Sequence, residues 1–315
     1  MRVPSTASNH AKGLILGILG VLLLSPDTLI IRLVDADPWT FIAWRGGLIT
    51  VGMIVIMVLR FGVAAAARTY AIGWLGLLIA LLFAVNNVFF QLSVQSTTVA
   101  NTLVILATAP LFAAVFSVAF LHERVPRRTW IATVFSTLGI CMVFIGELHT
   151  ENLFGNVAAL ISAVGLGIYF VLVRLGRPVD MSPAIGIAGI FVCLIGAGLA
   201  SDLYLEPQQF GLLAVLGLIL LPLSFVFLTR APHYISAPEV SLILLIETIL
   251  GPLWVWMVIT EEPPLQTIVG GGLIIIVLAI HATLSLRESR RLPKAVPITD
   301  IDANPAASPA TNPAE

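Results

Sequence analysis

Charged residues are scarce in this sequence. Lys, Arg, Asp and Glu make up 10% of its 315 residues, whereas a soluble domain carries about 25%, and a soluble domain with so little charge would aggregate. The charges also nearly cancel, at 16 basic against 17 acidic residues, so no net field favours binding to nucleic acid. The two cysteines, Cys141 and Cys193, lie in separate apolar runs, without the spacing of a metal site or of a disulfide framework.

The motifs of the common enzyme classes are missing as well. Neither lysine lies inside an apolar run, which excludes a retinal Schiff base. We find no Gly-x-Ser-x-Gly elbow and no Gly-x-x-x-x-Gly-Lys phosphate loop. His122-Glu123 begins like a zinc helix, but Pro126 stands where the second His belongs. We therefore expect no enzyme, no cofactor and no metal site, and without an ATP-binding domain any active transport must be secondary.

Long apolar runs are abundant instead, and the hydrophobic fraction is 58%. Each run is about 18–25 residues long, which suits a helix that crosses a hydrocarbon core of about 30 Å. The sequence therefore predicts an all-α integral membrane protein with ten transmembrane helices. They lie at roughly residues 13–34, 39–60, 70–93, 97–120, 128–146, 154–174, 183–200, 209–229, 236–260 and 266–286.

The charges between these runs separate by sign. If the N-terminus is cytoplasmic, the inner connections carry arginines and the outer connections carry acidic residues and no Lys or Arg, which is the positive-inside pattern. Only Arg32 and Arg45 fall outside it, and an even number of helices puts both termini in the cytoplasm. The inner arginines are Arg60, Arg68, Arg124, Arg127, Arg128, Arg174, Arg177 and Arg230. The outer acids are Asp35, Asp37, Glu147, Glu151, Asp202, Glu206, Glu261 and Glu262.

The chain repeats itself once, with a constant shift that places Glu123 on Glu261 and Thr129 on Thr267. VILATAPLFAAVFSVAFLHERVPRRTWIA and ILLIETILGPLWVWMVITEEPPLQTIVG share one layout: a long helix, an acidic turn, Pro, Thr and the next helix. Five helices per half is an odd number, so the two halves have opposite orientations. Inverted repeats of this kind mark secondary transporters, although duplication also occurs in proteins that transport nothing.

The ordered combination of motifs over residues 13–286 resembles the drug/metabolite transporter superfamily, EamA type. The early stretches SPDTLIIRL and DPWTFIAWRG contribute to the resemblance. Further matching positions are Pro110, Glu123, Arg124, Thr129, Gly139, Ala237, Pro238, Glu239, Val240, Glu247, Gly251, Pro252, Trp254, Trp256, Glu261, Pro263, Gly270 and Gly271. The resemblance implies a multi-pass carrier of the bacterial inner membrane, often an exporter of amino acids, metabolites or toxic compounds.

An acidic residue, Glu247, lies near the middle of the ninth predicted helix. Helix nine starts near Ser236, which puts Glu247 about 17 Å along it at 1.5 Å per residue, close to the bilayer centre. A charge there costs at least about 2.5–3.5 kcal/mol, so Glu247 should face a cavity or a partner, or stay protonated, which would suit proton coupling. Gly251 and Pro252 predict a weakened, hinge-like helix beside it, with Pro110 as the hinge candidate of the first half. The alternative is an interhelical hydrogen bond from a neutral Glu and a packing kink.

Other polar residues lie at a similar depth. Asn87 and Gln91 share a helix face, while Asn86 lies beside them and Asn101 lies in the outer half of helix four. Their amides could bind the substrate, or they could join helices. Weaker substrate-binding candidates are Tyr169, Ser224 and Trp254; the last could also belong to an interfacial aromatic belt.

Asp27 and Arg45 form a separate case. Each lies about 10 Å below the outer surface, on helices joined by a short hairpin. We predict that they form an ion pair, since two unpaired buried charges would be costly. The pair would be a structural staple, an external gate or an anchor for an anionic substrate group.

These features define four segments and one main hypothesis. The segments are a cytoplasmic tail at 1–12, five-helix repeats at 13–146 and 153–286, and a disordered cytoplasmic tail at 287–315. We expect a secondary transporter that works by alternating access, with export of amino acids or related small metabolites ahead of other substrates. The expected partners are the bilayer and a small-molecule substrate, with a proton and a second copy of the chain as further candidates. The alternative is a non-transporting membrane scaffold or accessory subunit, in which the buried polar residues would be sealed against neighbouring helices.

Overall fold

The computed structural model describes residues 6–122, 153–176 and 179–259, together with isolated positions between 126 and 138 and between 269 and 280. The described residues are helical throughout their regular structure and contain no strand. Eight helical segments are long and apolar enough to cross a membrane: His10–Val34, Pro38–Tyr70, Gly73–Ser96, Val99–Leu121, Leu153–Leu175, Ser182–Leu199, Pro207–His233 and Glu239–Ile259. The fifth and tenth predicted helices, Glu123, Glu261 and the C-terminal tail fall outside the described ranges.

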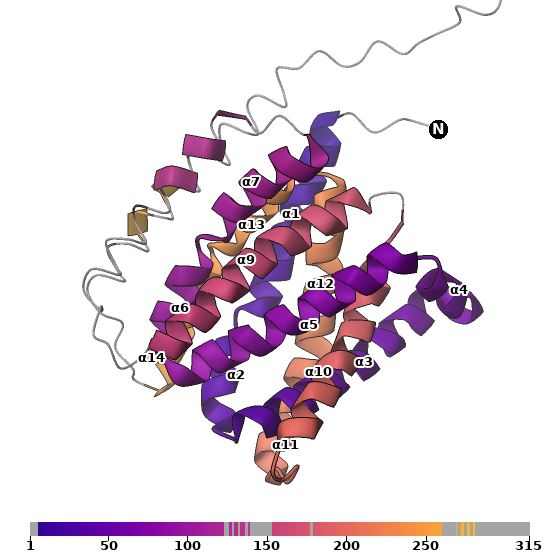
Figure 1. Ribbon diagram of the computed structural model, residues 1–315, viewed down its shortest axis with the longest axis vertical. Helices are drawn as coiled ribbons and strands as arrows, with labels where there is room; N and C mark the ends of the chain where they lie inside the picture. The colour runs from indigo at the N-terminus through magenta and orange to yellow at the C-terminus, as the bar shows by residue number, and fades with distance from the viewer. Residues whose placement is uncertain are drawn as a thin grey trace, which may run out of the picture.

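The first half of the chain contains seven α-helices and the second half contains six in the described part (Figure 1). Those of the first half are α1 (Thr6–Leu24), α2 (Asp27–Val34), α3 (Pro38–Phe61), α4 (Ala65–Tyr70), α5 (Gly73–Ser96), α6 (Val99–Leu106) and α7 (Ala109–Leu121). Those of the second half are α9 (Leu153–Leu175), α10 (Ser182–Leu199), α11 (Pro207–Val215), α12 (Leu221–Arg230), α13 (Ala237–Leu244) and α14 (Glu247–Ile259). A π-helical turn at Leu216–Leu220 joins α11 to α12.

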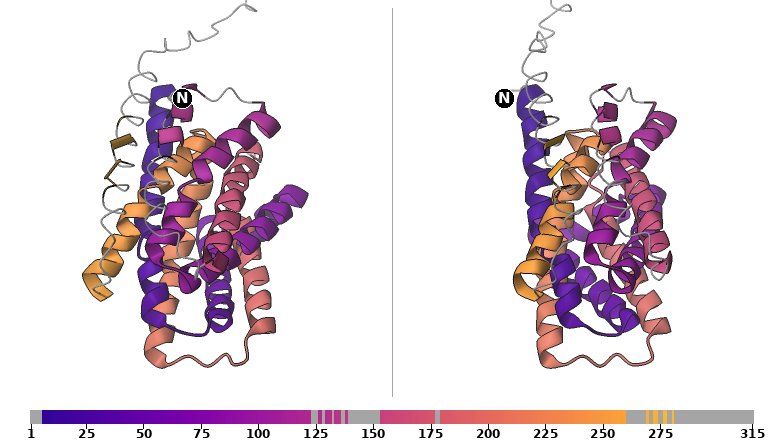
Figure 2. Two further views of the ribbon diagram at one scale, coloured as in Figure 1. Left: turned by 60° about the vertical axis from the view of Figure 1, so that its left-hand side comes forward. Right: turned by 90° about the vertical axis from the view of Figure 1, so that its left-hand side faces the viewer.

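The two ends of the helix bundle differ in charge. One end, here called the acidic end, carries Asp35, Asp37, Asp202 and Glu206. At this end the start of α3 contacts the α10–α11 connection, where the Thr40 hydroxyl donates to the carbonyl oxygen of Asp202. The opposite end, here called the arginine end, carries Arg60, Arg68, Arg174 and Arg230. The α10–α11 connection lies at the bottom of both views of Figure 2, at the acidic end, and the N-terminal helix starts at the opposite end.

Local sequence explains how the helices start. Asp37 precedes α3, and its carboxylate accepts the backbone N–H groups of Trp39 and Thr40, while Pro38 occupies the first turn where no N–H partner is needed. Ser236 and Glu239 form a reciprocal capping box at the start of α13. These caps satisfy backbone donors of the first helical turn, which have no partner within the helix.

Three of the membrane-spanning segments are broken near their middles. The first break is at Ser25–Pro26 between α1 and α2, the second at Ala107–Thr108 between α6 and α7, and the third at Leu245–Ile246 between α13 and α14. Pro26 lies in the first break, and Pro110 follows the second break in the first turn of α7. A proline supplies no N–H to the hydrogen bonds of a helix, so each proline weakens the helix at its break. At the second and third breaks the backbone tightens into i→i+3 hydrogen bonds, such as Thr108 N–H to Ile105 O at 3.0 Å and Thr248 N–H to Leu245 O at 3.1 Å.

The third break does not coincide with the expected hinge of the ninth helix. Gly251 and Pro252 were the expected hinge of the ninth helix, but both lie inside α14, and the chain breaks earlier, just before Glu247. Gly251 serves close packing, since a Cβ at that position would clash with the side chain of Leu103 on α6.

The second and third breaks lie at positions that the internal repeat relates to one another. The shift that places Glu123 on Glu261 also places the start of α6, Val99, on the start of α13, Ala237. It likewise places Ala109, the start of α7, on Glu247, the start of α14. The lengths match too, at 8 residues for α6 and α13 and 13 residues for α7 and α14. In space α6 packs against α14 and α7 against α13, so the two broken segments lie side by side with opposite directions.

A close helix crossing ties the halves together elsewhere. Helices α3 and α10 pack along each other, and Gly46 and Gly189 face one another at the crossing. A Cβ on either glycine would come within 2.7 Å of a backbone carbonyl oxygen of the other helix. Only glycine therefore permits this approach, as at other close contacts of membrane helices.

Candidate functional site

A cavity lies where the helix breaks converge. Its walls come from the breaks of all three interrupted segments and from α3, α5, α9 and α12. Its volume is about 80 Å³. Most of its wall is apolar, and its charged side chains are Asp27, Arg45 and Glu247. The interior therefore has the character of a small-molecule site.

Asp27 and Arg45 form the predicted ion pair. Asp27 is the first residue of α2, and both of its carboxylate oxygens accept from the Arg45 guanidinium on α3, Oδ1 from Nη1 at 2.5 Å and Oδ2 from Nη2 at 2.6 Å. The two side chains are 2% and 1% exposed, so water does not solvate either charge. This bidentate geometry compensates part of the cost of burial, and it makes the two residues one neutral unit.

Glu247 begins α14, at the third helix break. Its side chain is buried, and its Oε2 atom has no hydrogen-bond partner among the described residues. The negative charge of Asp27 is near enough to act on it, while Arg45 is already engaged by Asp27. Glu247 is thus a buried carboxyl group, lining a cavity, that the neighbouring protein does not neutralise.

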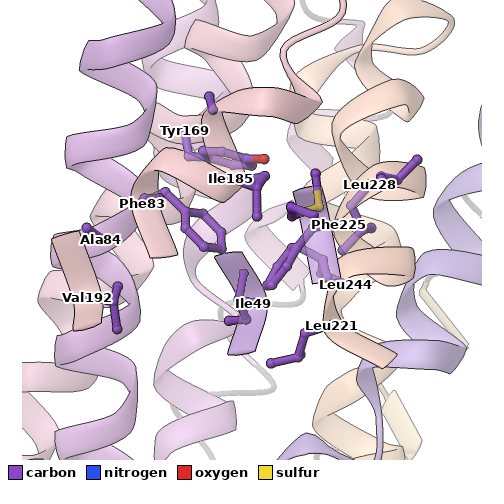
Figure 3. Packing of buried hydrophobic residues seen from close by; sticks show 14 of the residues in the cluster. Ile49, Phe83, Ala84, Tyr169, Ile185, Val192, Leu221, Phe225, Leu228 and Leu244 are labelled. Atoms are coloured by element: carbon purple, nitrogen blue, oxygen red, sulfur yellow. The ribbon is translucent and has the colours of Figure 1, made fainter. Parts of the chain in front are cut away.

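Aromatic rings cover another part of the cavity wall. Phe83 lies 4.7 Å from Phe225 and 5.3 Å from Tyr169, measured between ring centroids, and Tyr169 lies 5.1 Å from Phe170. Figure 3 shows Phe83, Tyr169 and Phe225 gathered in the packed interior. The Tyr169 hydroxyl lies 2.8 Å from the Thr229 hydroxyl, which satisfies it. We call Phe83, Tyr169, Phe170 and Phe225 the aromatic wall.

The two adjacent asparagines of α5 have different surroundings, although both line the cavity. Asn86 donates to the carbonyl oxygen of Ser162 on α9 at 2.6 Å and therefore joins two helices. Asn87 is also buried, but its Oδ1 atom has no partner among the described residues. Of the two, Asn87 is the group still available to a ligand.

Four other predicted substrate-binding residues do not line the cavity. The Ser224 hydroxyl donates to Gly20 O at 2.7 Å, and the Asn101 amide donates to the Thr97 hydroxyl at 3.2 Å. Trp254 donates to the Ser25 hydroxyl at 3.1 Å. Gln91 is fully buried, and neither of its amide atoms has a partner in the described part of the chain.

Two arginines that the sequence did not single out as site residues bind carbonyl groups just before the broken segments. Arg32 donates to the carbonyl oxygen of Thr97 at 2.9 Å, just before α6, and Arg174 donates to that of Ile235 at 2.6 Å, just before α13. The shift of 138 residues that places Val99 on Ala237 also places Thr97 on Ile235, whereas the two arginines are 142 residues apart. The accepting carbonyl groups are therefore repeat-related, and each arginine lies in the last turn of its own helix. The contacts lie at opposite ends of the bundle. The internal repeat was a signal that could have directed attention to them.

A second group missed by the sequence lies at the arginine end. Asp180, before α10, accepts from Arg60 at 3.1 Å and from Arg230 at 3.3 Å, and it also accepts from the backbone N–H of Ser182 at 3.0 Å. Partial burial works to raise the pKa of Asp180, but the Ser182 hydrogen bonds and the charges of Arg230 and Arg60 outweigh it and lower that pKa. Asp180 therefore ties together the ends of α3, α10 and α12.

Known proteins with similar sequences are transporters. A pseudopaline exporter, CntI, from Pseudomonas aeruginosa is 28% identical over 172 residues, which cover 53% of this chain and 60% of the exporter. The chain thus matches less than two thirds of that relative's length. An uncharacterised transporter, YdfC, from Bacillus subtilis is 24% identical over 212 residues, covering 64% of this chain and 66% of that protein.

The fold has a counterpart among solved structures. One crystal structure superposes with a TM-score of 0.73 over 89% of this chain and 99% of the other, at 15% sequence identity. That likeness supports the fold alone. The sequence pattern of the EamA-like transporter family matches residues 11–145 and 153–283, one match for each half. The chain therefore belongs to the EamA-like transporter family and is a multi-pass membrane protein.

Proposed function

We propose that this protein is a secondary active exporter of small amine-containing metabolites, such as amino acids or toxic compounds, in the bacterial inner membrane. The observation that carries the proposal is the cavity at the helix breaks, which is lined by an unneutralised carboxyl group on Glu247. Broken helices around a central site are the usual construction of secondary transporters. The names of the similar proteins support export.

The geometry suggests how access would alternate. The second and third breaks lie side by side, in the segments α6–α7 and α13–α14, which run in opposite directions. Arg32 binds a carbonyl group just before α6, and Arg174 binds one just before α13. We propose that the two halves rock about the cavity, so that one end opens while the other stays closed. We propose that the arginine end faces the cytoplasm, as the positive-inside rule favours, and that both termini lie on that side.

The alternative, a non-transporting scaffold, makes a different demand on the same residues. It requires the buried polar groups to be sealed against neighbouring helices. Asn86, Asn101 and Ser224 meet that demand, but Asn87 and Glu247 keep unpartnered oxygen atoms at a cavity. These last two favour a transporter.

A growth screen tests the proposal. A transport-deficient bacterial host would express the wild type, Glu247→Gln or Asp35→Asn, and growth would be scored on toxic amino acids, their analogues and cationic drugs. Asp35 is an exposed carboxylate outside the cavity wall, at a backbone φ of 40° that asparagine also adopts readily, so Asp35→Asn is the matched control.

We expect wild type and Asp35→Asn to protect against one class of compound and Glu247→Gln to lose that protection at equal membrane expression. Protection retained by Glu247→Gln would remove Glu247 from the transport mechanism. If no strain is protected, flux into liposomes containing the purified protein decides between an importer, which moves solute, and a scaffold, which does not.

A further inference from the structure

The ionisable groups around the cavity leave one carboxyl group, that of Glu247, without a cationic partner on the cavity wall. Asp27 and Arg45 cancel one another through two short hydrogen bonds. Glu247 is the remaining ionisable carboxyl group, and the other residues of the wall carry no charge. A ligand that brings one positive charge would neutralise an ionised Glu247, whereas an anion would place a second unpaired charge in a poorly solvated space.

The unpartnered polar atoms point to the same kind of ligand. Among the described residues of the cavity wall, unpartnered buried atoms occur on Glu247 (Oε2), Asn87 (Oδ1) and Arg45 (Nε). The first two are acceptors. The third belongs to a guanidinium whose two terminal nitrogens already hold Asp27. The wall therefore offers acceptors to a ligand that carries N–H donors.

A ligand carboxylate, by contrast, finds no free cationic partner on the cavity wall. The natural one is Arg45, but a carboxylate would have to displace Asp27 from a bidentate pair and leave that aspartate buried and unpaired, which is strongly unfavourable. No lysine is among the residues that line the cavity. A zwitterionic amino acid would thus satisfy its ammonium group and leave its carboxylate without a counter-charge.

The aromatic wall supplies the apolar part of the site. Four rings from α5, α9 and α12 lie on the cavity surface. Ring faces attract cations, and they also bury the hydrocarbon part of an amphipathic ligand. An apolar body attached to an ammonium group would use both parts of the cavity.

We infer that the cavity selects a small organic monocation, whose ammonium group binds the free oxygen atoms of Glu247 and Asn87 while its apolar body rests on the aromatic wall. This inference rests on the proposed transport function and narrows it. Amines without a free carboxylate are then better substrates than amino acids.

Three probes that share a phenyl ring test the inference on the full chain in lipid nanodiscs at neutral pH. They are 2-phenylethylamine, a cation; L-phenylalanine, a zwitterion; and 3-phenylpropionate, an anion. Binding would be measured by isothermal titration calorimetry. We expect the cation to bind about tenfold or more tightly than either other probe, because it alone gains a charge-assisted hydrogen bond without leaving a carboxylate unpaired.

The variants separate charge from shape. Glu247→Gln keeps the size of the side chain and should reduce the affinity for the cation about tenfold, while Asp35→Asn should leave it unchanged. Thermal unfolding of each variant confirms that it is folded. Tighter binding of L-phenylalanine or 3-phenylpropionate, cation binding unchanged in Glu247→Gln, or no binding of any probe to the folded wild type would overturn the inference. The growth screen decides the transport function independently, because it also scores amino acids.

Discussion

At the break between α6 and α7 the chain carries Ala109, and at the repeat-related break between α13 and α14 it carries Glu247. The backbones at these two places match in helix length and in the position of the break. The chemistry does not match. The comparison teaches that the duplicated framework provides the cavity, while one half alone provides its unpaired carboxyl group.

The membrane-spanning segments His10–Val34 and Leu153–Leu175 also differ in the chemistry of their side chains. Arg32 and Arg174 bind repeat-related carbonyl groups from the last turns of their helices, so these two arginines occupy equivalent positions in the two halves. The spacing between them also sets Asp27 opposite Tyr169. Asp27 holds Arg45 in an ion pair, whereas Tyr169 holds only the hydroxyl of Thr229 and belongs to the aromatic wall. The charged part of the cavity and its aromatic part thus occupy equivalent positions as well.

Breaking the ion pair should have the largest effect. Asp27→Asn or Arg45→Met alone should lower the free energy of unfolding by about 3–5 kcal/mol, because each leaves one buried charge unpaired. The double variant should lose less than either single variant. The matching change in the second half, Tyr169→Phe, removes one neutral hydrogen bond and should cost about 0.5–1.5 kcal/mol.

Unfolding in mixed detergent micelles, followed by circular dichroism, measures these four variants. A double variant as unstable as the sum of the two single variants would mean that Asp27 and Arg45 act independently. The comparison of the halves would then fail at this position.

Removing Arg32 or Arg174 should have an intermediate effect on the free energy of unfolding. Arg32→Gln or Arg174→Gln should each lower the free energy of unfolding by about 1.5–3 kcal/mol, because each removes a charged donor from a backbone carbonyl. Their effects on access should be opposite. With Ala107→Cys as a reporter on the cavity wall, in a background without Cys141 and Cys193, Arg32→Gln should increase labelling from the acidic end and Arg174→Gln from the arginine end.

Membrane-impermeant thiol reagents added to right-side-out or inverted vesicles measure this difference. Arg68→Gln, an exposed arginine on α4 away from both contacts, is the control and should leave labelling unchanged. Equal labelling of the Arg32 and Arg174 variants from the same side would contradict the assignment of the two contacts to opposite ends.

Asp180 should give the smallest effect. Its side chain is 20% exposed, so its pairs with Arg60 and Arg230 should stabilise the fold by about 0–1 kcal/mol. Because its folded pKa lies below the ordinary value of 3.8, this stability is present above that value and is lost as the pH falls through the folded pKa. Asp180→Asn should therefore be less stable than wild type at pH 7, and the difference should vanish in acid. A difference that persists well below the ordinary aspartate range would assign the effect to packing.

The sequence alone determined the broad architecture. Apolar run lengths predicted the eight spans found among the described residues, since bilayer thickness and helix rise leave little freedom. The constant shift between the two similar stretches predicted that the second half repeats the first. The matching depth and opposite sign of Asp27 and Arg45 predicted their ion pair, because isolated charges at that depth would be too costly.

Only the tertiary structure decided which polar residues remain free. Asn86 and Asn87 are neighbours in sequence, yet the first is bonded to α9 and the second faces the cavity with an unpartnered oxygen. Likewise Pro252 was a reasonable place for a break, but the chain breaks before Glu247, where two antiparallel segments meet. A hydrogen-bond partner is set by a helix distant in sequence, so its presence cannot be read from local spacing, whereas the need of each helix to fit the bilayer can.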